Sequence, residues 1–162
     1  MSATGLEVFD RTLQTTNTWL GEIMHLLETD RQVAWKVLSV VLHRLRDRLP
    51  VELAAHLGSQ LPLLVRGVFY DQYQPARQPG DCRTLEAFIA EVAEWLADTR
   101  PVDPKLAVHA VFAVLSRHVP EGQLDNVRGA LPSSLRSYWE GIDGAEARRP
   151  PETDDRPDLA GI

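Results

Sequence analysis

The stretch VLHRLRDRLPVELAAHLGSQLPLLVRGVFY, residues 41–70, decides how this chain folds. Apolar residues recur in it at helical spacing, and Pro50 and Pro62 each follow a leucine, where a proline can end one helix and begin the next. The same arrangement returns 70 positions later in VFAVLSRHVPEGQLDNVRGALPSSLRSYWE, residues 111–140. The apolar positions coincide without a gap: Leu42 with Phe112, Leu45 with Leu115, Leu57 with Val127, Val65 with Leu135, and Phe69 with Trp139. This match predicts an internal duplication.

Helical patterning extends both halves beyond these stretches. One deletion near a turn brings the segment around Trp19 onto the segment around Phe88. The predicted helices before the repeat boundary cover residues 5–27, 33–49, 51–58 and 63–70, and the pattern resumes over 85–96 and 106–119. We expect an all-α protein in which two tandem duplicated four-helix units pack as one bundle about a pseudo-twofold axis. Because each unit alone has a thin core, this packing would bury the nearly apolar segment 63–70 and its counterpart 133–139.

The composition divides the chain into four parts. Residues 1–72 form the first helical repeat and residues 85–140 the second. Residues 73–84 are rich in Gln, Pro, Arg and Gly, show no helical period and are expected to be a linker. Residues 141–162 carry acids, prolines and almost no large apolar side chain, which predicts a disordered acidic tail. The end of this tail fits either a docking peptide or an unselected flexible end.

Length and composition limit the class of protein. The 162 residues are 44% hydrophobic and 25% charged, which excludes a wholly disordered or collagen-like chain. Acidic residues outnumber basic ones and give a net charge of −6, which opposes nucleic-acid binding. Cys82 is the sole cysteine, so an internal disulfide and a cysteine-rich zinc site are excluded. Without a secretory signal or an apolar run long enough for a membrane helix, the chain is expected to be cytoplasmic.

Three segments of the chain resemble a known family: TTNTWLGEIM, the stretch 41–73, and the stretch 110–139. The specific pieces are RDRLP at 46–50, His56-Leu57, Gln60-Leu61-Pro62 and Arg66-Gly67. In these pieces the chain resembles the bacterial and archaeal family called domain of unknown function 2267, over about residues 6–140. Tyr73 departs from the pattern, in which a tryptophan is usual. The resemblance implies an all-helical fold, and it supplies no catalytic residues because the family has no assigned activity.

Asp47, His56 and Arg66 are the candidate binding residues. Asp47 and Arg66 are expected to form an ion pair between the second and fourth helices. His43 lies one helical turn before Asp47, which fits either an oriented imidazole–carboxylate pair or an ordinary surface pair. Glu52 and His56 repeat this spacing, and the same two interpretations apply.

Arg44, Arg46 and Arg48 form the one dense basic run of the chain. The helical period places Arg44 and Arg48 on a mixed face that is expected to be solvated. Because the run contains no aromatic residue that could stack on bases, structural pairing is favoured over nucleic-acid binding. Glu22 and His25 have the Glu-x-x-His spacing of di-iron bundles, but this pair does not recur in the second half. We therefore expect no metal site and no cofactor.

No set of residues in the sequence converges on a reaction. Neither Gly-x-Ser-x-Gly nor a glycine-rich phosphate loop occurs. We expect a non-enzymatic helical interaction module that binds a protein partner or a second copy of itself. Two alternatives stay open. One is a small-molecule binder or enzyme with its site between the repeats, where Asp47, His56 or Arg66 would face inward. The other is a nucleic-acid-associated protein that uses the arginine run.

Overall fold

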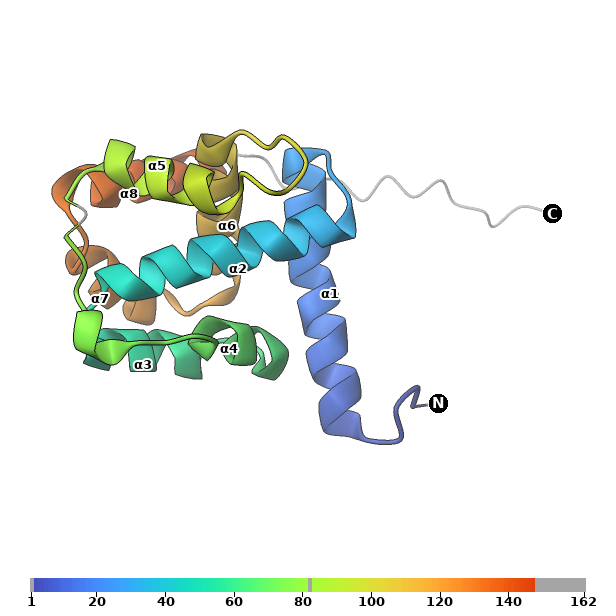
Figure 1. The fold of residues 1–162 in the computed structure, drawn as a ribbon. Helices are drawn as coiled ribbons and strands as arrows, with labels where there is room; N and C mark the ends of the chain where they lie inside the picture. Colours follow the sequence, from blue (N-terminus) through green and yellow to red (C-terminus); the bar gives the residue numbers. More distant parts are fainter. Residues whose placement is uncertain (1, 82, 148–162) are drawn as a thin grey trace.

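The computed structural model describes residues 2–81 and 83–147, and over these residues the chain is all-α, with no strand (Figure 1). The eight α-helices are α1 (Glu7–Leu27), α2 (Arg31–Arg48), α3 (Val51–Ser59), α4 (Leu63–Tyr70), α5 (Leu85–Trp95), α6 (Pro104–His118), α7 (Glu121–Gly129) and α8 (Ser133–Ala147). A short 3₁₀ turn, η1 (Pro75–Arg77), lies between α4 and α5. The predicted all-α class is therefore confirmed. No helix of the described ranges is long and apolar enough to cross a membrane.

Local signals in the sequence account for where the helices begin. The Asp30 carboxylate accepts a hydrogen bond of 2.9 Å from the backbone N–H of Val33 and caps α2. Thr84 caps α5 in the same way. Pro50 and Pro62 are the N-cap residues of α3 and α4, so the two prolines separate the helices as their positions predicted.

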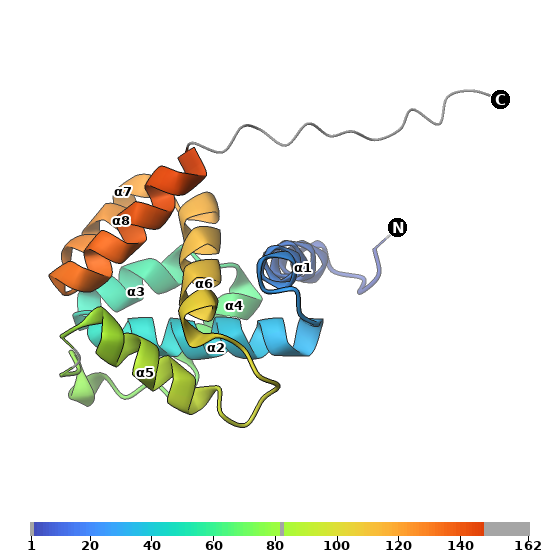
Figure 2. The same ribbon diagram turned by 90° about the horizontal axis from the view of Figure 1, so that it is seen from above.

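The helices α2 and α6 form the centre of the bundle and contact each other (Figures 1 and 2). Nearly all residues of α6 from Ala107 to Leu115 are buried, which is expected for a helix that other helices surround. The largest fully buried side chains come from five helices: Trp19, Phe69, Phe88, Phe112 and Trp139. The rings of Phe112 and Trp139 stack with their centroids 4.1 Å apart. One continuous core therefore joins α1–α4 to α5–α8.

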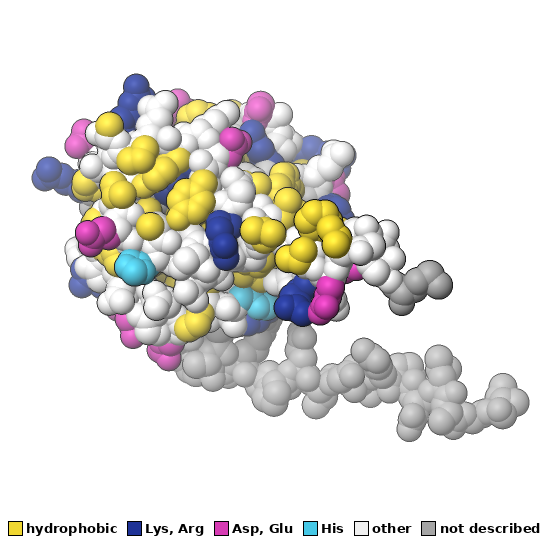
Figure 3. All heavy atoms as spheres, turned by 90° about the horizontal axis from the view of Figure 1, so that it is seen from below, with side chains coloured by type: hydrophobic (Ala, Val, Ile, Leu, Met, Phe, Trp, Pro, Cys, Tyr) yellow, Lys and Arg dark blue, Asp and Glu magenta, His cyan; other side chains and the backbone are white. Residues whose placement is uncertain are grey.

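The helix α4 is less buried than its apolar sequence predicts. Its main contacts are with α1, α2 and α3, and only Val65 and Phe69 are fully buried. Leu63 and Leu64 are 50% and 41% exposed, and hydrophobic side chains accordingly gather on this face of the molecule (Figure 3). The expectation that the whole segment 63–70 is buried between the halves is wrong. The helical period turns only one side of this short helix toward the core, whatever the composition of its other side.

The helix α8 continues past the predicted start of a disordered tail. Residues 141–147 are its last two turns, so the expected boundary at residue 141 is wrong. Ile142 extends the buried stripe of Trp139 and is only 4% exposed. Asp143 pairs with Arg128 of α7 at 3.1 Å. The remaining part of the predicted tail, residues 148–162, lies outside the described residues.

The predicted linker packs on α2 along part of its length. The backbone N–H of Gly80 donates a hydrogen bond of 2.8 Å to the carbonyl oxygen of Asp47. The Gln78 side chain donates to the carbonyl oxygen of Arg46, and the Tyr73 hydroxyl donates to Gln78. These contacts fix the segment 73–80 over the C-terminal half of α2. Cys82, further along this segment, lies outside the described residues.

Candidate functional site

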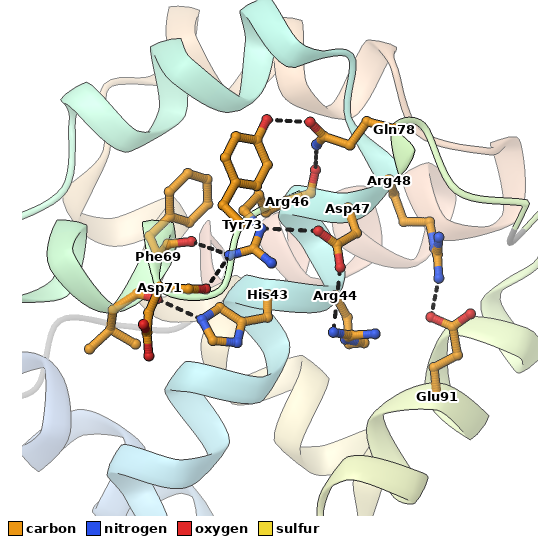
Figure 4. Close-up of polar contacts among 11 residues, drawn as sticks. His43, Arg44, Arg46, Asp47, Arg48, Phe69, Asp71, Tyr73, Gln78 and Glu91 are labelled. Carbon is orange, nitrogen blue, oxygen red and sulfur yellow. Dashed lines mark hydrogen bonds and ion pairs between the residues drawn. The ribbon is translucent and has the colours of Figure 1, made fainter. Parts of the chain in front are cut away.

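Arg46 is the buried centre of the basic run, with 3% of its surface exposed. Its Nη1 donates to the carbonyl oxygens of Phe69 at 2.6 Å and Asp71 at 2.9 Å, and its Nε donates to Asp47 at 3.0 Å (Figure 4). The guanidinium also lies over the Tyr73 ring, 4.8 Å from its centroid. Arg46 therefore satisfies backbone acceptors at the C-terminal end of α4, and it holds this end against α2.

Arg44 and Arg48 point toward α5 from the same helix. The Arg44 guanidinium lies 4.8 Å from the centroid of the Trp95 ring and 3.4 Å from the Asp47 carboxylate. Arg48 forms an ion pair with Glu91 (Figure 4). The side chains of Arg44 and Arg48 are only 17% and 8% exposed. The prediction of a solvated face is therefore wrong, because the segment 73–80 and α5 cover it.

His43 does not form the predicted pair with Asp47. Its Nε2 lies 2.6 Å from the carbonyl oxygen of Val68, which requires a proton on this nitrogen (Figure 4). Burial, together with the positive charges of Arg46 and Arg44, lowers the pKa of His43 below its usual value. At neutral pH His43 is thus a neutral hydrogen-bond donor that joins α2 to α4.

These side chains line a cleft of about 620 Å³, which we call the arginine cleft. Its walls are the C-terminal half of α2, the segment 72–80 and the Trp95 side chain of α5; the charged lining residues are Arg44, Arg46, Asp47, Arg48 and Arg77. Sequence reasoning identified the α2 residues but not Tyr73, Arg77, Gly80 or Trp95. The segment 73–80 has no hydrophobic period that would show which of its side chains turn inward, so the sequence did not identify these residues as part of a cleft.

Arg66 has a structural role that the sequence did not predict. Its Nε donates to Gly58 O at 3.0 Å, and its Nη2 donates to Ser59 O and Leu61 O, both at 3.1 Å. The predicted ion pair between Arg66 and Asp47 is wrong, because each side chain is committed to other partners. Arg66 closes the turn between α3 and α4 by bonding its orphan carbonyls.

Arg136 closes the turn between α7 and α8 with the same atoms. Its Nε donates to Arg128 O at 3.2 Å, and its Nη2 donates to Gly129 O at 3.2 Å and to Leu131 O at 3.3 Å. Each acceptor lies 70 positions after the corresponding acceptor of Arg66.

His56 is exposed on α3 and does not line the arginine cleft. Glu52, one turn earlier, is also exposed. The three candidate binding residues are thus not brought together: Asp47 lines the arginine cleft, and Arg66 lines a different groove beside α1.

Glu22 and His25, the residues with di-iron spacing, separate in the structure. His25 is exposed, whereas Glu22 pairs with the C-terminal end of α6. His118 Nε2 lies 3.0 Å from the Glu22 carboxylate, and its ring stacks on Trp19 with the centroids 5.4 Å apart. Among the described residues no group of three or more His, Cys, Asp or Glu side chains could hold a metal ion.

A second surface is apolar and lies at the start of α1. The first part of this helix extends beyond the rest of the bundle (Figure 1). The N-cap residue Leu6 and the helix residues Val8, Phe9 and Leu13 are 42–55% exposed. Two grooves flank it, of about 400 Å³ toward the α3–α4 turn and about 370 Å³ toward α2. We call the set Leu6, Val8, Phe9, Leu13, Leu63 and Leu64 the apolar surface.

Comparison with known proteins places the chain in a family without an assigned activity. The family model described as "Uncharacterized conserved protein (DUF2267)" matches residues 16–138. The match includes the α2 and α5 walls of the arginine cleft and both arginine-closed turns, and it begins after the exposed part of α1. No curated protein matches the chain.

Proposed function

The chain belongs to the DUF2267 family, and from this premise we propose that it is a non-enzymatic helical interaction module, which binds a protein partner or a second copy of itself. The observation that carries the proposal is the apolar surface. Four large apolar side chains are exposed near the start of α1. Their contact with water is unfavourable in free energy, and they contribute little to the core. A partner that covered them would remove this apolar area from water.

The grooves beside α1 favour a helical or extended protein segment as the bound partner. Leu13 lines the groove toward α2, and Val8 and Leu63 line the groove toward the α3–α4 turn. Neither groove is lined by a carboxylate; Arg31 lines the groove toward α2, and Arg11, Arg66 and His118 line the groove toward the α3–α4 turn. Apolar grooves of this kind accept the apolar face of an amphipathic segment.

Sedimentation analysis of a double variant, Phe9→Glu with Leu13→Glu, tests the proposal. Gln14→Glu with Thr18→Glu is the matched control, because both residues are exposed on the same helix and add the same charge. If the chain self-associates, the wild type and the control should gain mass with concentration and the Phe9/Leu13 variant should stay monomeric. Circular dichroism should show that all three proteins are folded.

A protein partner is tested with the same variants. A protein that the wild type captures should be purified and its binding to each variant measured directly. Its affinity for the Phe9/Leu13 variant should be at least tenfold lower than for the wild type, and its affinity for the control should be unchanged. A wild type that stays monomeric, together with binding that both variants retain equally, would contradict the proposed use of the apolar surface.

The arginine cleft favours a second candidate function, the binding of a small molecule. The cleft is concave, lies between α2 and α5, and contains Asp47 with the aromatic rings of Tyr73 and Trp95. A thermal-shift screen with metabolites tests this function, since a ligand at 100 times its dissociation constant stabilises the folded state by about 2.7 kcal/mol. The absence of any shift over the panel would count against it.

We also propose that the bundle is a tandem duplication with a pseudo-twofold axis, in which α1–α4 correspond to α5–α8. The principal helix contacts support this. When each helix is replaced by its counterpart in the other half, each contact between two helices becomes another observed contact. The contact of α1 with α2 becomes that of α5 with α6, α1 with α6 becomes α5 with α2, and α2 with α4 becomes α6 with α8. Likewise, α1 with α4 becomes α5 with α8, and α3 with α4 becomes α7 with α8. The contact of α2 with α6 and the contact of α3 with α7 each join a helix to its own counterpart, so the exchange leaves them unchanged.

Two ion pairs support the same correspondence. Arg48 of α2 binds Glu91 of α5, and His118 of α6 binds Glu22 of α1. Arg48 and His118 are 70 positions apart, and Glu22 and Glu91 are 69 apart, as the single deletion requires. Each pair therefore ties the end of a central helix to the first helix of the other half.

The proposal includes neither nucleic acid nor a membrane as a partner, and it places the protein in the cytoplasm. The side chains of Arg44, Arg46 and Arg48 are only 17%, 3% and 8% exposed and line a cleft, so they do not form an exposed basic surface on which a duplex could lie. In a gel shift with duplex DNA at low salt, any complex that the wild type forms should also be formed by the double variant Arg44→Ala with Arg48→Ala.

A further inference from the structure

The arginine cleft carries an excess of positive charge within an acidic chain. Four of its lining side chains are arginines, and the lining carboxylate is that of Asp47, which Arg44 and Arg46 already share. Glu91, behind the cleft, pairs with Arg48. The lowered pKa of His43 leaves this residue neutral at physiological pH, so it adds no charge of its own to this wall.

The cleft also has more hydrogen-bond donors than protein acceptors. The Nε atoms of Arg44 and Arg48 are buried and have no acceptor among the described residues. Each guanidinium has five N–H donors and no acceptor, so a buried group of this kind needs oxygen atoms around it. Arg46 is different, because carbonyl oxygens and Asp47 satisfy much of its capacity.

Arg77 lines the wall opposite α2, on η1. Its side chain is exposed and makes no hydrogen bond or ion pair with the described part of the chain. Arg44, in contrast, is held by the ring of Trp95, so its planar fork is already oriented. A ligand in the cleft would thus meet one preorganised guanidinium, that of Arg44, and one exposed guanidinium without a partner among the described residues, that of Arg77.

Comparison of the two halves indicates that the fold itself does not require this cluster. The positions of Arg44, Arg46 and Asp47 correspond, 70 residues later, to Val114, Ser116 and Arg117. There the Trp139 indole donates to Ser116 at 2.7 Å, and the arginine beside this ring, Arg128, comes from α7 and pairs with Asp125 and Asp143. A half of this bundle can therefore pack without the arginine cluster.

We propose that the arginine cleft binds a small polyanion, a molecule with two or more negative charges on phosphate or carboxylate groups. The proposal rests on the second candidate function, small-molecule binding, and is independent of the apolar surface. The ligand oxygens would accept hydrogen bonds from Arg44 and Arg77, the two arginines with the most free donors, in the paired geometry that guanidinium favours. Asp47 would exclude ligands that place a negative group on its side of the cleft.

Isothermal titration calorimetry of the full chain at constant ionic strength tests the proposal. The probes are pyrophosphate for the phosphate class, citrate for the carboxylate class, and glycerol as a neutral control. The test variant is Arg77→Gln, because this exposed side chain supports no other contact. Arg11→Gln is the matched control, since it removes the same charge from a side chain that is 75% exposed and outside the cleft.

We expect saturable binding of at least one of the two anions, weakened at least tenfold in Arg77→Gln and within twofold of wild type in Arg11→Gln. Arg44→Gln should weaken the same binding, with its fold checked by circular dichroism.

Binding of pyrophosphate alone or of citrate alone would support the proposal and select the ligand class. Equal weakening in Arg77→Gln and Arg11→Gln would overturn it, because the effect would then be general charge. A neutral metabolite that binds the cleft while both anions fail would overturn the anion proposal and leave the small-molecule function standing. No binding by anions or metabolites would overturn both.

Discussion

The two arginine-closed turns allow a quantitative test of the proposed duplication. The substitutions Arg66→Lys and Arg136→Lys keep the positive charge but remove the planar guanidinium group with its several N–H donors. A single ammonium cannot reproduce the geometry in which Nε bonds one carbonyl and Nη2 bonds two others. Each variant should therefore lose about two of three hydrogen bonds.

The expected magnitude follows from these bonds and their surroundings. A hydrogen bond from a charged donor contributes about 1.5–3 kcal/mol when buried, and both arginines are only half-buried, so about 1 kcal/mol for each lost bond is appropriate. Each variant should thus lower the free energy of unfolding by about 2 kcal/mol. The bonds of Arg136 are 3.2–3.3 Å long and those of Arg66 are 3.0–3.1 Å, so Arg136→Lys should have the slightly smaller effect.

Urea unfolding followed by circular dichroism measures this loss by linear extrapolation. The double variant should lose the sum of the two single effects, because the two turns share no bonded partner. Arg11→Lys, at an exposed position, should stay within about 0.5 kcal/mol of wild type. If Arg66→Lys costs about 2 kcal/mol and Arg136→Lys less than about 0.5 kcal/mol, the two turns are not energetically equivalent and the reasoning fails.

Two further predictions concern the wall of the arginine cleft. In Gly80→Ala the new Cβ would collide with Arg48 Nη1 and lie 2.9 Å from its Cζ, so stability should fall by about 1–3 kcal/mol in urea unfolding. The same change in an Arg48→Met background should cost clearly less; an equal cost would contradict the contact. Because the pKa of His43 is lowered in the folded state, the unfolded chain takes up its proton first as the pH falls below about 6.5. Wild-type stability should then fall by up to about 1.4 kcal/mol per pH unit from this residue, and His43→Gln should show a smaller slope between pH 7 and 5, whereas an unchanged slope would refute the assignment.

Much of the fold could be predicted because its signals are local. Pro62 begins α4, and the structure gives this helix the predicted bounds, Leu63–Tyr70. What failed there was the direction of the side chains: a nearly apolar sequence carries little contrast between an inner and an outer face. The prediction of where α8 ends was wrong for the opposite reason. The polar composition after Glu140 outweighed a single apolar residue, Ile142, that in fact continues the buried stripe.

The arginine cleft could be predicted only in part, because its two walls are far apart in the sequence. The run from Arg44 to Arg48 was visible, but its exposure depends on what packs over it. The covering residues, Tyr73, Gln78 and Gly80, belong to a segment without regular structure. This segment touches α2 through hydrogen bonds to backbone carbonyl oxygens and through the Tyr73 ring, over which the Arg46 guanidinium lies. No periodicity encodes such a long-range contact, and so the face was predicted to be solvated.

In the proposed duplication, the two candidate sites lie where the correspondence between the halves ends. The start of α5, Leu85, matches residue 16 of α1, so the exposed beginning of α1 that carries Phe9 and Leu13 has no counterpart in the second half. The arginine cluster likewise replaces Val114 and Ser116 at the corresponding places in α6. Arg66 and Arg136, in contrast, agree in position and close corresponding turns. Both additions of the first half carry a physical cost for the chain alone. One exposes apolar side chains to water, and the other leaves the buried Nε atoms of Arg44 and Arg48 without an acceptor among the described residues, as Arg128 Nε is in the second half. A bound partner or ligand would offset both costs, which is the physical reason to test these two places first.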